Sequence, residues 1–149
     1  MIMEDKKIEI KEGREIPFDQ LISLYDSVGW AAYTNEERRS DLKKAVRNSS
    51  YVITAWCEGR LIALARGLSD DVSIFYLQDI LVSPEFQRRG IGKQLLTRCL
   101  ERYQHVRSRV LLTDDEEKQM QFYESMGFIN TKNLKQFKIN AFVLTEGVI

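Results

Sequence analysis

The segment from Ile80 to Lys93 carries residue types whose spacing suits the binding of a phosphate group. Gly90 and Gly92 let the backbone bend closely around a ligand. A helix that begins at Ile91 has first N–H groups with no partner inside the helix, and such groups bind anions. Positive charge is added by three neighbouring side chains, Arg88, Arg89 and Lys93. We therefore predict an anion-binding loop between a strand and a helix.

Two other phosphate-binding loops fit this segment less well. A P-loop requires a glycine at position 87 and Ser or Thr after Gly-Lys, whereas this chain has Gln87 and Gln94. That reading fails. A dinucleotide-binding loop requires a third glycine where this chain has Leu95, so that reading is weak.

A closer match is the pattern Val-x-Pro followed by Gln-x-x-Gly-x-Gly over residues 82–92. It resembles the acetyl-CoA motif of the GCN5-related N-acetyltransferase (GNAT) superfamily. A second segment, residues 122–128, is similar to another motif of this superfamily, in which Tyr123 stands four residues before Gly-Phe. Members usually have Asn seven residues before this Tyr and a small residue four before it. Here those positions hold Glu116 and Gln119, which puts in doubt the cofactor contact made by that Asn.

The resemblance implies transfer of an acetyl group from acetyl-CoA to a primary amine in a ternary complex, without a metal. In the superfamily the strand before the loop is splayed from its neighbour. The free backbone groups of that strand correspond by position to those of two residues in this chain. The resemblance implies that the Ile80 N–H would face the thioester carbonyl and that Val82 would pair with the pantetheine amide. The full set of expected cofactor-binding residues is Ile80, Leu81, Val82, Gln87, Arg88, Arg89, Gly90, Ile91, Gly92 and Lys93.

Acetyl transfer needs an acid for the leaving thiolate and a neutral amine as nucleophile. Tyr123 is the candidate acid, because a phenol with an ordinary pKa of about 10 stays protonated at neutral pH. The alternative is that its ring only packs under the sheet. Asp79 and Asp114 are the candidate bases, and each has an alternative role as a turn, cap or sheet-edge carboxylate. If water carries the proton away, no dedicated base is needed.

The aromatic residues near the first two helices are candidates for the acceptor pocket. In the superfamily, the segment that joins these helices borders that pocket, and large aromatic side chains are costly to leave exposed. Core packing explains the same residues equally well. The expected acceptor-binding residues are Trp30, Tyr33, Tyr25 and Tyr76.

The expected elements are strands and helices in the order of a mixed α/β fold. Apolar periodicity, caps and turn residues predict them over Ile8–Ile10, Pro17–Gly29 (helix), Thr34–Asn48 (helix), Tyr51–Trp56, Leu61–Leu68, Val72–Val82, Ile91–Gln104 (helix), Val110–Leu112, Asp114–Gly127 (helix) and Phe137–Leu144. The resemblance implies a central mixed, mostly antiparallel sheet with helices on both faces and splayed strands around the cofactor.

Composition predicts one globular domain over residues 1–149, with 44% hydrophobic and 30% charged residues. The 22 basic and 22 acidic residues balance, so we expect no nucleic-acid partner, and no apolar run is long enough to span a membrane. No secretory signal is recognisable, so a cytoplasmic location is expected. Cys57 and Cys99 are expected to be buried free thiols.

The acceptor amine is not identified, and a homodimer is only one possible assembly. The alternative to an enzyme is an acyl-CoA-binding regulatory module that has lost turnover, for which Glu116 and Gln119 are the support.

Overall fold

A computed structural model describes residues 6–145 of the chain. The chain forms two compact units, Met1–Leu112 and Thr113–Ile149. The first unit holds a five-stranded sheet and most of the helices, and the second holds the last helix. The expectation of a mixed α/β fold with a mostly antiparallel sheet is confirmed.

The sheet has its strands side by side in chain order, from β1 to β5. All neighbours are antiparallel except β4 and β5, which are parallel. The central strands are apolar on both faces and almost fully buried, as expected of strands covered from both sides. The strands are β1 (Ile8–Glu12), β2 (Tyr51–Cys57), β3 (Arg60–Ser69), β4 (Ile74–Val82) and β5 (Ser108–Leu111).

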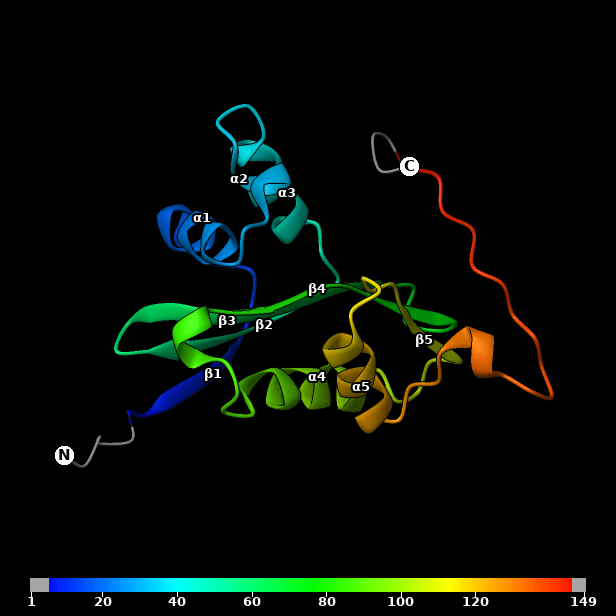
Figure 1. Ribbon diagram of the computed structural model, residues 1–149. Coiled ribbons are helices and arrows are strands. Elements are labelled where there is room, and N and C mark those ends of the chain that lie inside the picture. Colours follow the sequence, from blue (N-terminus) through cyan, green and yellow to red (C-terminus); the bar gives the residue numbers. More distant parts are fainter. Residues whose placement is uncertain (1–5, 146–149) are drawn as a thin grey trace. The chain divides into compact units, whose positions relative to one another are not determined.

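Helices cover both faces of this sheet (Figure 1). On one face lie α1 (Phe18–Ser27), α2 (Ala31–Thr34) and α3 (Arg39–Arg47), where Leu21, Leu42 and Val46 join a cluster with strand residues. On the other face, α4 (Ile91–Arg102) packs against β2, β3 and β4. Its buried residues recur at helical spacing, which gives it one apolar face. None of the helices between residues 6 and 145 has the length and apolar character needed to cross a bilayer.

Two irregularities shape the middle of β4. Arg66 lies opposite Asp79, but the next residue, Gly67, lies opposite Leu77, so Gln78 is an extra residue on β4 and forms a bulge. The pairing of β4 with β5 also ends at Leu77, whereas β4 continues to Val82. Among the described residues, the last five of β4 therefore have a strand neighbour on one edge only, which is the splay that the resemblance implies.

One helix over Thr34–Asn48 was expected, and the structure has a shorter one there, α3, which begins at Arg39, whereas Thr34 is the last residue of α2. The Thr34 hydroxyl donates to the Asp26 carboxylate at 2.9 Å and does not cap the backbone near Glu37. The Asn35 side chain accepts from the Arg38 N–H, which forms a turn between α2 and α3. Thr34 and Glu37 have the spacing of a capping box, which would start a helix at this point. No such box forms because the Thr34 hydroxyl has a tertiary partner.

In the second unit, α5 (Glu117–Ser125) begins three residues later than the acidic run that starts at Asp114. A short 3₁₀ turn, η2 (Thr131–Asn133), follows. The strand expected over Phe137–Leu144 is wrong, since the structure assigns no strand there. A strand needs a neighbour for its backbone hydrogen bonds, and the described part of this unit contains no other strand.

Candidate functional site

The loop between β4 and α4 begins with a short 3₁₀ helix, η1 (Pro84–Phe86). The Gln87 side chain then donates to the Val82 carbonyl at 2.9 Å, which ties the loop to the end of β4. Arg88 (φ 65°) and Gly90 (φ 78°) both adopt the left-handed conformation. This conformation is costly for arginine and free for glycine, so the loop has a fixed and partly strained path.

The backbone N–H groups of residues 88–93 have no acceptor among the described residues. The first backbone hydrogen bond of α4 is donated by the Gln94 N–H to the Gly90 carbonyl at 3.1 Å. Left-handed residues that alternate with other conformations turn successive N–H groups toward one side and form an anion-binding nest. This run of free donors continues into the N-terminus of α4, where the helix dipole also favours negative charge.

The three basic residues of the loop are exposed. The Arg89 guanidinium lies 5.2 Å from the centre of the Phe86 ring, which is buried and anchors the loop. Gly90 and Lys93 line a cavity of about 380 Å³ that runs along α4 toward Ile10 of β1. Positively charged side chains and this cavity therefore lie next to the free N–H groups.

The free edge of β4 offers further backbone groups. Ser83 donates its N–H to Ile62 of β3 at 2.8 Å, so at this point the N–H points toward β3. Because N–H groups alternate between the two edges of a strand, those of Ile80 and Val82 point to the opposite edge, beyond the end of the β5 pairing. The side chain of Leu81 instead joins the core under α1.

Aromatic residues expected in the acceptor pocket gather around Tyr25. Its ring contacts Trp30 and Tyr33 edge to face, with centres 5.7 Å and 5.6 Å apart. Trp30, Tyr33 and Tyr76 are half-buried, whereas Tyr25 has no exposed surface and lies in the core. Burial first, and then the Asp79 carboxylate and Tyr33, raise the pKa of Tyr76.

Asp79 lies in a buried polar cluster. Its Oδ2 accepts from the Tyr25 hydroxyl at 2.8 Å and from Nε of Arg66 at 2.7 Å. Burial lowers the pKa of Arg66, but the Asp79 carboxylate outweighs this effect, so the guanidinium stays charged. Arg66 is not among the site residues expected from the sequence. Its position within an otherwise apolar strand is the signal that marks it.

The remaining expected catalytic residues, Tyr123 and Asp114, belong to the second unit. Asp114 is exposed, and Tyr123 is half-buried near the end of α5. Burial raises the pKa of Tyr123 to about 12, so its phenol is protonated at neutral pH. Glu116 is the N-cap residue of α5, without a side-chain capping bond, and the Gln119 side chain accepts from the Thr113 hydroxyl.

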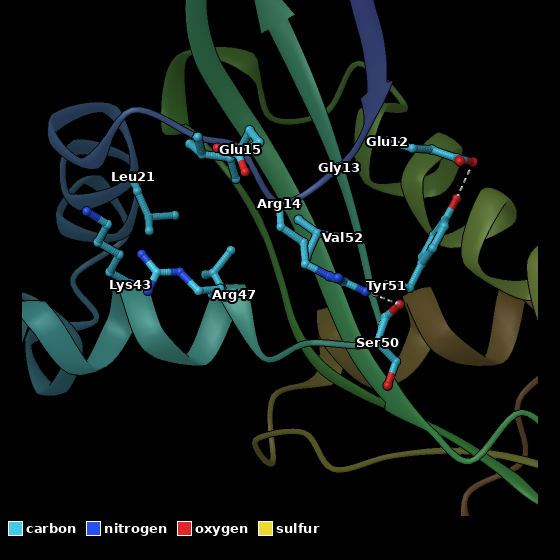
Figure 2. Close-up of a pocket in the computed structure, with 12 residues that line it drawn as sticks. Glu12, Gly13, Arg14, Glu15, Leu21, Lys43, Arg47, Ser50, Tyr51 and Val52 are labelled. Carbon is cyan, nitrogen blue, oxygen red and sulfur yellow. Dashed lines mark hydrogen bonds between the residues drawn. The ribbon is translucent and has the colours of Figure 1, made fainter.

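Another cavity lies away from this loop, under the segment that joins β1 to α1 (Figure 2). It measures about 530 Å³, and no expected site residue lines it. Figure 2 shows Lys43 and Arg47 rising from α3 toward Leu21, while Arg14 turns toward the Ser50 carbonyl, to which it donates at 3.3 Å. The basic residues that line this cavity are exposed, and the loop residues expected to bind the cofactor lie outside the cavity.

Comparison with known proteins agrees with the fold. The sequence model of the acetyltransferase (GNAT) family matches residues 16–128. The uncharacterized N-acetyltransferase ycf52 of Pyropia yezoensis is 27% identical over 131 residues, which cover 85% of this chain and 73% of that protein. A GNAT family acetyltransferase from Streptococcus pneumoniae TIGR4 has a TM-score of 0.74 and 31% identity, over 90% of this chain and 98% of that chain.

A more distant structure shares the fold. The aminoglycoside N-acetyltransferase AAC(6')-Iy, solved in complex with CoA, has a TM-score of 0.67 at 16% identity, over 95% of this chain and all of that chain. The family model spans both sequence motifs and the whole of the sheet except β1. On these grounds, this chain belongs to the acetyltransferase (GNAT) family.

Proposed function

We propose that this protein transfers an acetyl group from acetyl-CoA to a primary amine by direct attack within a ternary complex. The observation that carries the proposal is the run of backbone N–H groups over residues 88–93 that have no acceptor among the described residues. This run follows the end of β4, whose last residues extend beyond the pairing with β5. A diphosphate has the charge and the acceptor oxygens that such a run binds. The CoA complex of AAC(6')-Iy, which has the same fold, supports this choice.

The backbone of β4 holds the acyl end of the donor. Bound acetyl-CoA would supply an acyl thioester, whose carbonyl carbon accepts the amine. The Ile80 N–H, on the free edge, donates to the carbonyl oxygen as negative charge develops there. The Val82 N–H on the same edge binds the pantetheine arm, and Arg88, Arg89 and Lys93 place charge beside the phosphates.

Tyr123 donates its proton to the leaving sulfur. Its pKa of about 12 keeps the phenol protonated over the whole neutral range. The phenol O–H therefore donates a hydrogen bond to the sulfur, and the proton moves as negative charge develops there while the bond to the acyl carbon breaks. The amine arrives neutral and gives its proton to water, with exposed Asp114 as the residue to test for assistance. The half-buried rings of Trp30, Tyr33 and Tyr76 border the acceptor.

The test is thiol release from acetyl-CoA with a panel of amines, together with calorimetry for CoA. The panel contains a polyamine, an aminoglycoside, an arylalkylamine and a peptide with a free amino terminus. We expect CoA to bind and at least one amine to release thiol. Binding without release on any amine would point to an acyl-CoA-binding module, and absence of CoA binding would defeat both functions.

Charge removal tests the loop itself. The double variant Arg88→Ala/Lys93→Ala should weaken CoA binding by about tenfold or more, since the two charge-assisted phosphate contacts together contribute about 1.4 kcal/mol or more. Lys44→Ala, which removes an exposed basic residue of α3, is the matched control. Acetylpantetheine, which has no diphosphate, should bind the wild type and the double variant equally.

A further inference from the structure

Three buried side chains join two strands and a helix on the α1 side of the sheet. Arg66 of β3 is 5% exposed, Asp79 of β4 is 4% exposed and Tyr25 of α1 is fully buried. The Arg66 guanidinium also donates through Nη1 to the hydroxyl of Ser49, just after α3, at 3.3 Å. Ser49 donates in turn to the Ala45 carbonyl of α3 at 2.8 Å. We call Tyr25, Arg66 and Asp79 the buried triad.

Stability alone does not account for such an arrangement. Taking two charges out of water is costly, and a buried ion pair can often be replaced by apolar residues at no loss of stability. What the pair does provide is direction, because each hydrogen bond fixes both a distance and an angle. The buried triad fixes the position of Asp79 relative to β3 and α1 at once.

The fixed orientation of Asp79 matters because of the place of this residue in β4. It lies between the bulge residue Gln78 and Ile80, and the bulge leaves β4 one residue out of step with β3. Ile80 is also beyond the last β5 pair, so no strand between residues 6 and 145 pairs with the edge to which its N–H points. The Asp79 side chain therefore anchors the strand one residue before the backbone donor.

A role for Asp79 as general base conflicts with its partners. Accepting a proton would neutralise Asp79 and leave Arg66 as an unpaired cation in a site that is almost closed to water. An unpaired buried charge is strongly destabilising. Both described hydrogen bonds to the carboxylate arrive at the same oxygen, Oδ2, so this oxygen already accepts from two buried donors.

We infer that Asp79, held by Arg66 and Tyr25, is a positioning residue that aims the Ile80 N–H at the acyl oxygen, and that it is not the general base. The inference deepens the proposed function and rests on it for its catalytic readout. Loss of the triad should lower kcat while the affinity for CoA, which depends on the loop at residues 88–93, stays the same.

The decisive variants remove the charges one at a time and then together. Asp79→Asn leaves Arg66 unpaired, and we expect kcat to fall by about tenfold or more, a change of about 1.4 kcal/mol in the barrier. Arg66→Gln/Asp79→Asn contains no buried charge and keeps two amides that can bond to each other. It should recover kcat to within about threefold of the wild type, with an unchanged pH profile.

A milder variant covers the case in which Asp79→Asn does not fold. Tyr25→Phe removes one hydrogen bond and no charge, and it should lower kcat by about threefold to tenfold. Tyr51→Phe is its matched control, since the Tyr51 hydroxyl donates to the Glu12 carboxylate at 2.7 Å in another part of the sheet. It should lower the Tm and leave kcat unchanged.

Two outcomes would overturn the inference. If the double variant folds, stays as slow as Asp79→Asn and loses the acidic limb of the pH profile, Asp79 is the base. If the variants lower only the Tm and kcat per folded molecule is unchanged, the triad is merely structural.

A measurement without turnover separates this inference from the proposed function. The Ile80 amide resonance in ¹H–¹⁵N spectra should shift in Asp79→Asn and return toward its wild-type position in Arg66→Gln/Asp79→Asn. An Ile80 resonance that does not respond would sink the positioning role even in an active enzyme. A resonance that responds in a protein with no turnover would leave positioning intact and defeat the proposed function.

Discussion

The N–H of Phe128 donates to the carbonyl of Tyr123 at 3.1 Å, and the rings of these two residues lie 6.0 Å apart. Between them, Gly127 has a φ of 96° and donates its N–H to Glu124 at 3.0 Å. This pair of bonds with an apolar contact is a Schellman motif, which ends a helix and satisfies its last carbonyls. The Tyr-x-x-x-Gly-Phe pattern therefore has a structural cause that is independent of any catalytic role of Tyr123.

Gly127→Ala should loosen the end of α5. An alanine in the left-handed conformation costs about 1–2 kcal/mol, so hydrogen exchange at the Phe128 N–H should become faster by roughly tenfold. Gly127→Asn is the matched variant, since Asn tolerates this conformation, and it should exchange more slowly than Gly127→Ala. Equal exchange in the wild type and Gly127→Ala would contradict the role of the motif.

Gly90→Ala should weaken CoA binding through the path of the backbone alone. A Cβ at Gly90 meets nothing within 4 Å, but the φ of 78° strains any other residue. Gly59, in the β2–β3 turn, has a φ of 77° and equally open surroundings, so Gly59→Ala is a matched control. Both variants should lose about 1–2 kcal/mol of unfolding free energy.

Calorimetry then distinguishes the two glycines. CoA affinity should fall in Gly90→Ala and stay at the wild-type value in Gly59→Ala. A parallel fall in both variants would mean that the loop has no special part in binding.

Gly67→Ala should destabilise the sheet at the bulge. A Cβ at this position would lie 2.4 Å from the Phe75 ring and 2.7 Å from the carbonyl oxygen of Tyr76, so both the side chain and the backbone must move. Overpacking of this kind costs about 1–3 kcal/mol, measured as a lower urea midpoint. Phe75→Leu in the same chain should recover only part of the loss, because the Tyr76 carbonyl still clashes. Full recovery would show that the backbone contact is unimportant.

Tyr123→Phe should lower kcat by about tenfold or more while CoA affinity is kept. The folded pKa of Tyr123 is about 12 and its ordinary value is 10.0, so the phenol remains protonated throughout an assay from about pH 6 to pH 9. The variant should therefore be slower by the same factor at every pH in that range. Unchanged turnover would remove Tyr123 from the mechanism.

Alkaline solution should destabilise the fold in part through Cys99. Burial raises the pKa of this thiol from 9.0 to about 12. Its contribution to stability is therefore complete below pH 9, where both states are protonated, and is lost as the pH rises toward 12 because the unfolded chain releases its proton first.

Urea unfolding of the wild type and Cys99→Ala at about pH 7 and about pH 10.5 measures this effect. The wild type should lose more stability between the two pH values than the variant does. Equal losses would mean that Cys99 is not responsible. Buried tyrosines with raised pKa, such as Tyr25 and Tyr103, account for the loss that persists in the variant.

Features that depend on neighbours in the chain are readable from the sequence of this protein. The glycines and basic residues between Val82 and Lys93 form their loop from local backbone geometry, so their order is enough to predict it. The same holds for Gly127, whose left-handed conformation ends α5 within a few residues. Strands β2 and β3 follow from apolar runs on either side of a short turn.

Tertiary structure alone decided the features whose partners are distant. Asp79 is 54 residues from Tyr25, so no spacing in the sequence shows that its carboxylate is already engaged. Thr34 has the right neighbour for a capping box and bonds to Asp26 instead. Phe137–Leu144 has apolar residues suited to a strand, but a strand also needs a partner, and its own unit has none among the described residues. Local patterns state what a segment is able to form, and the competition among distant partners determines what it does form.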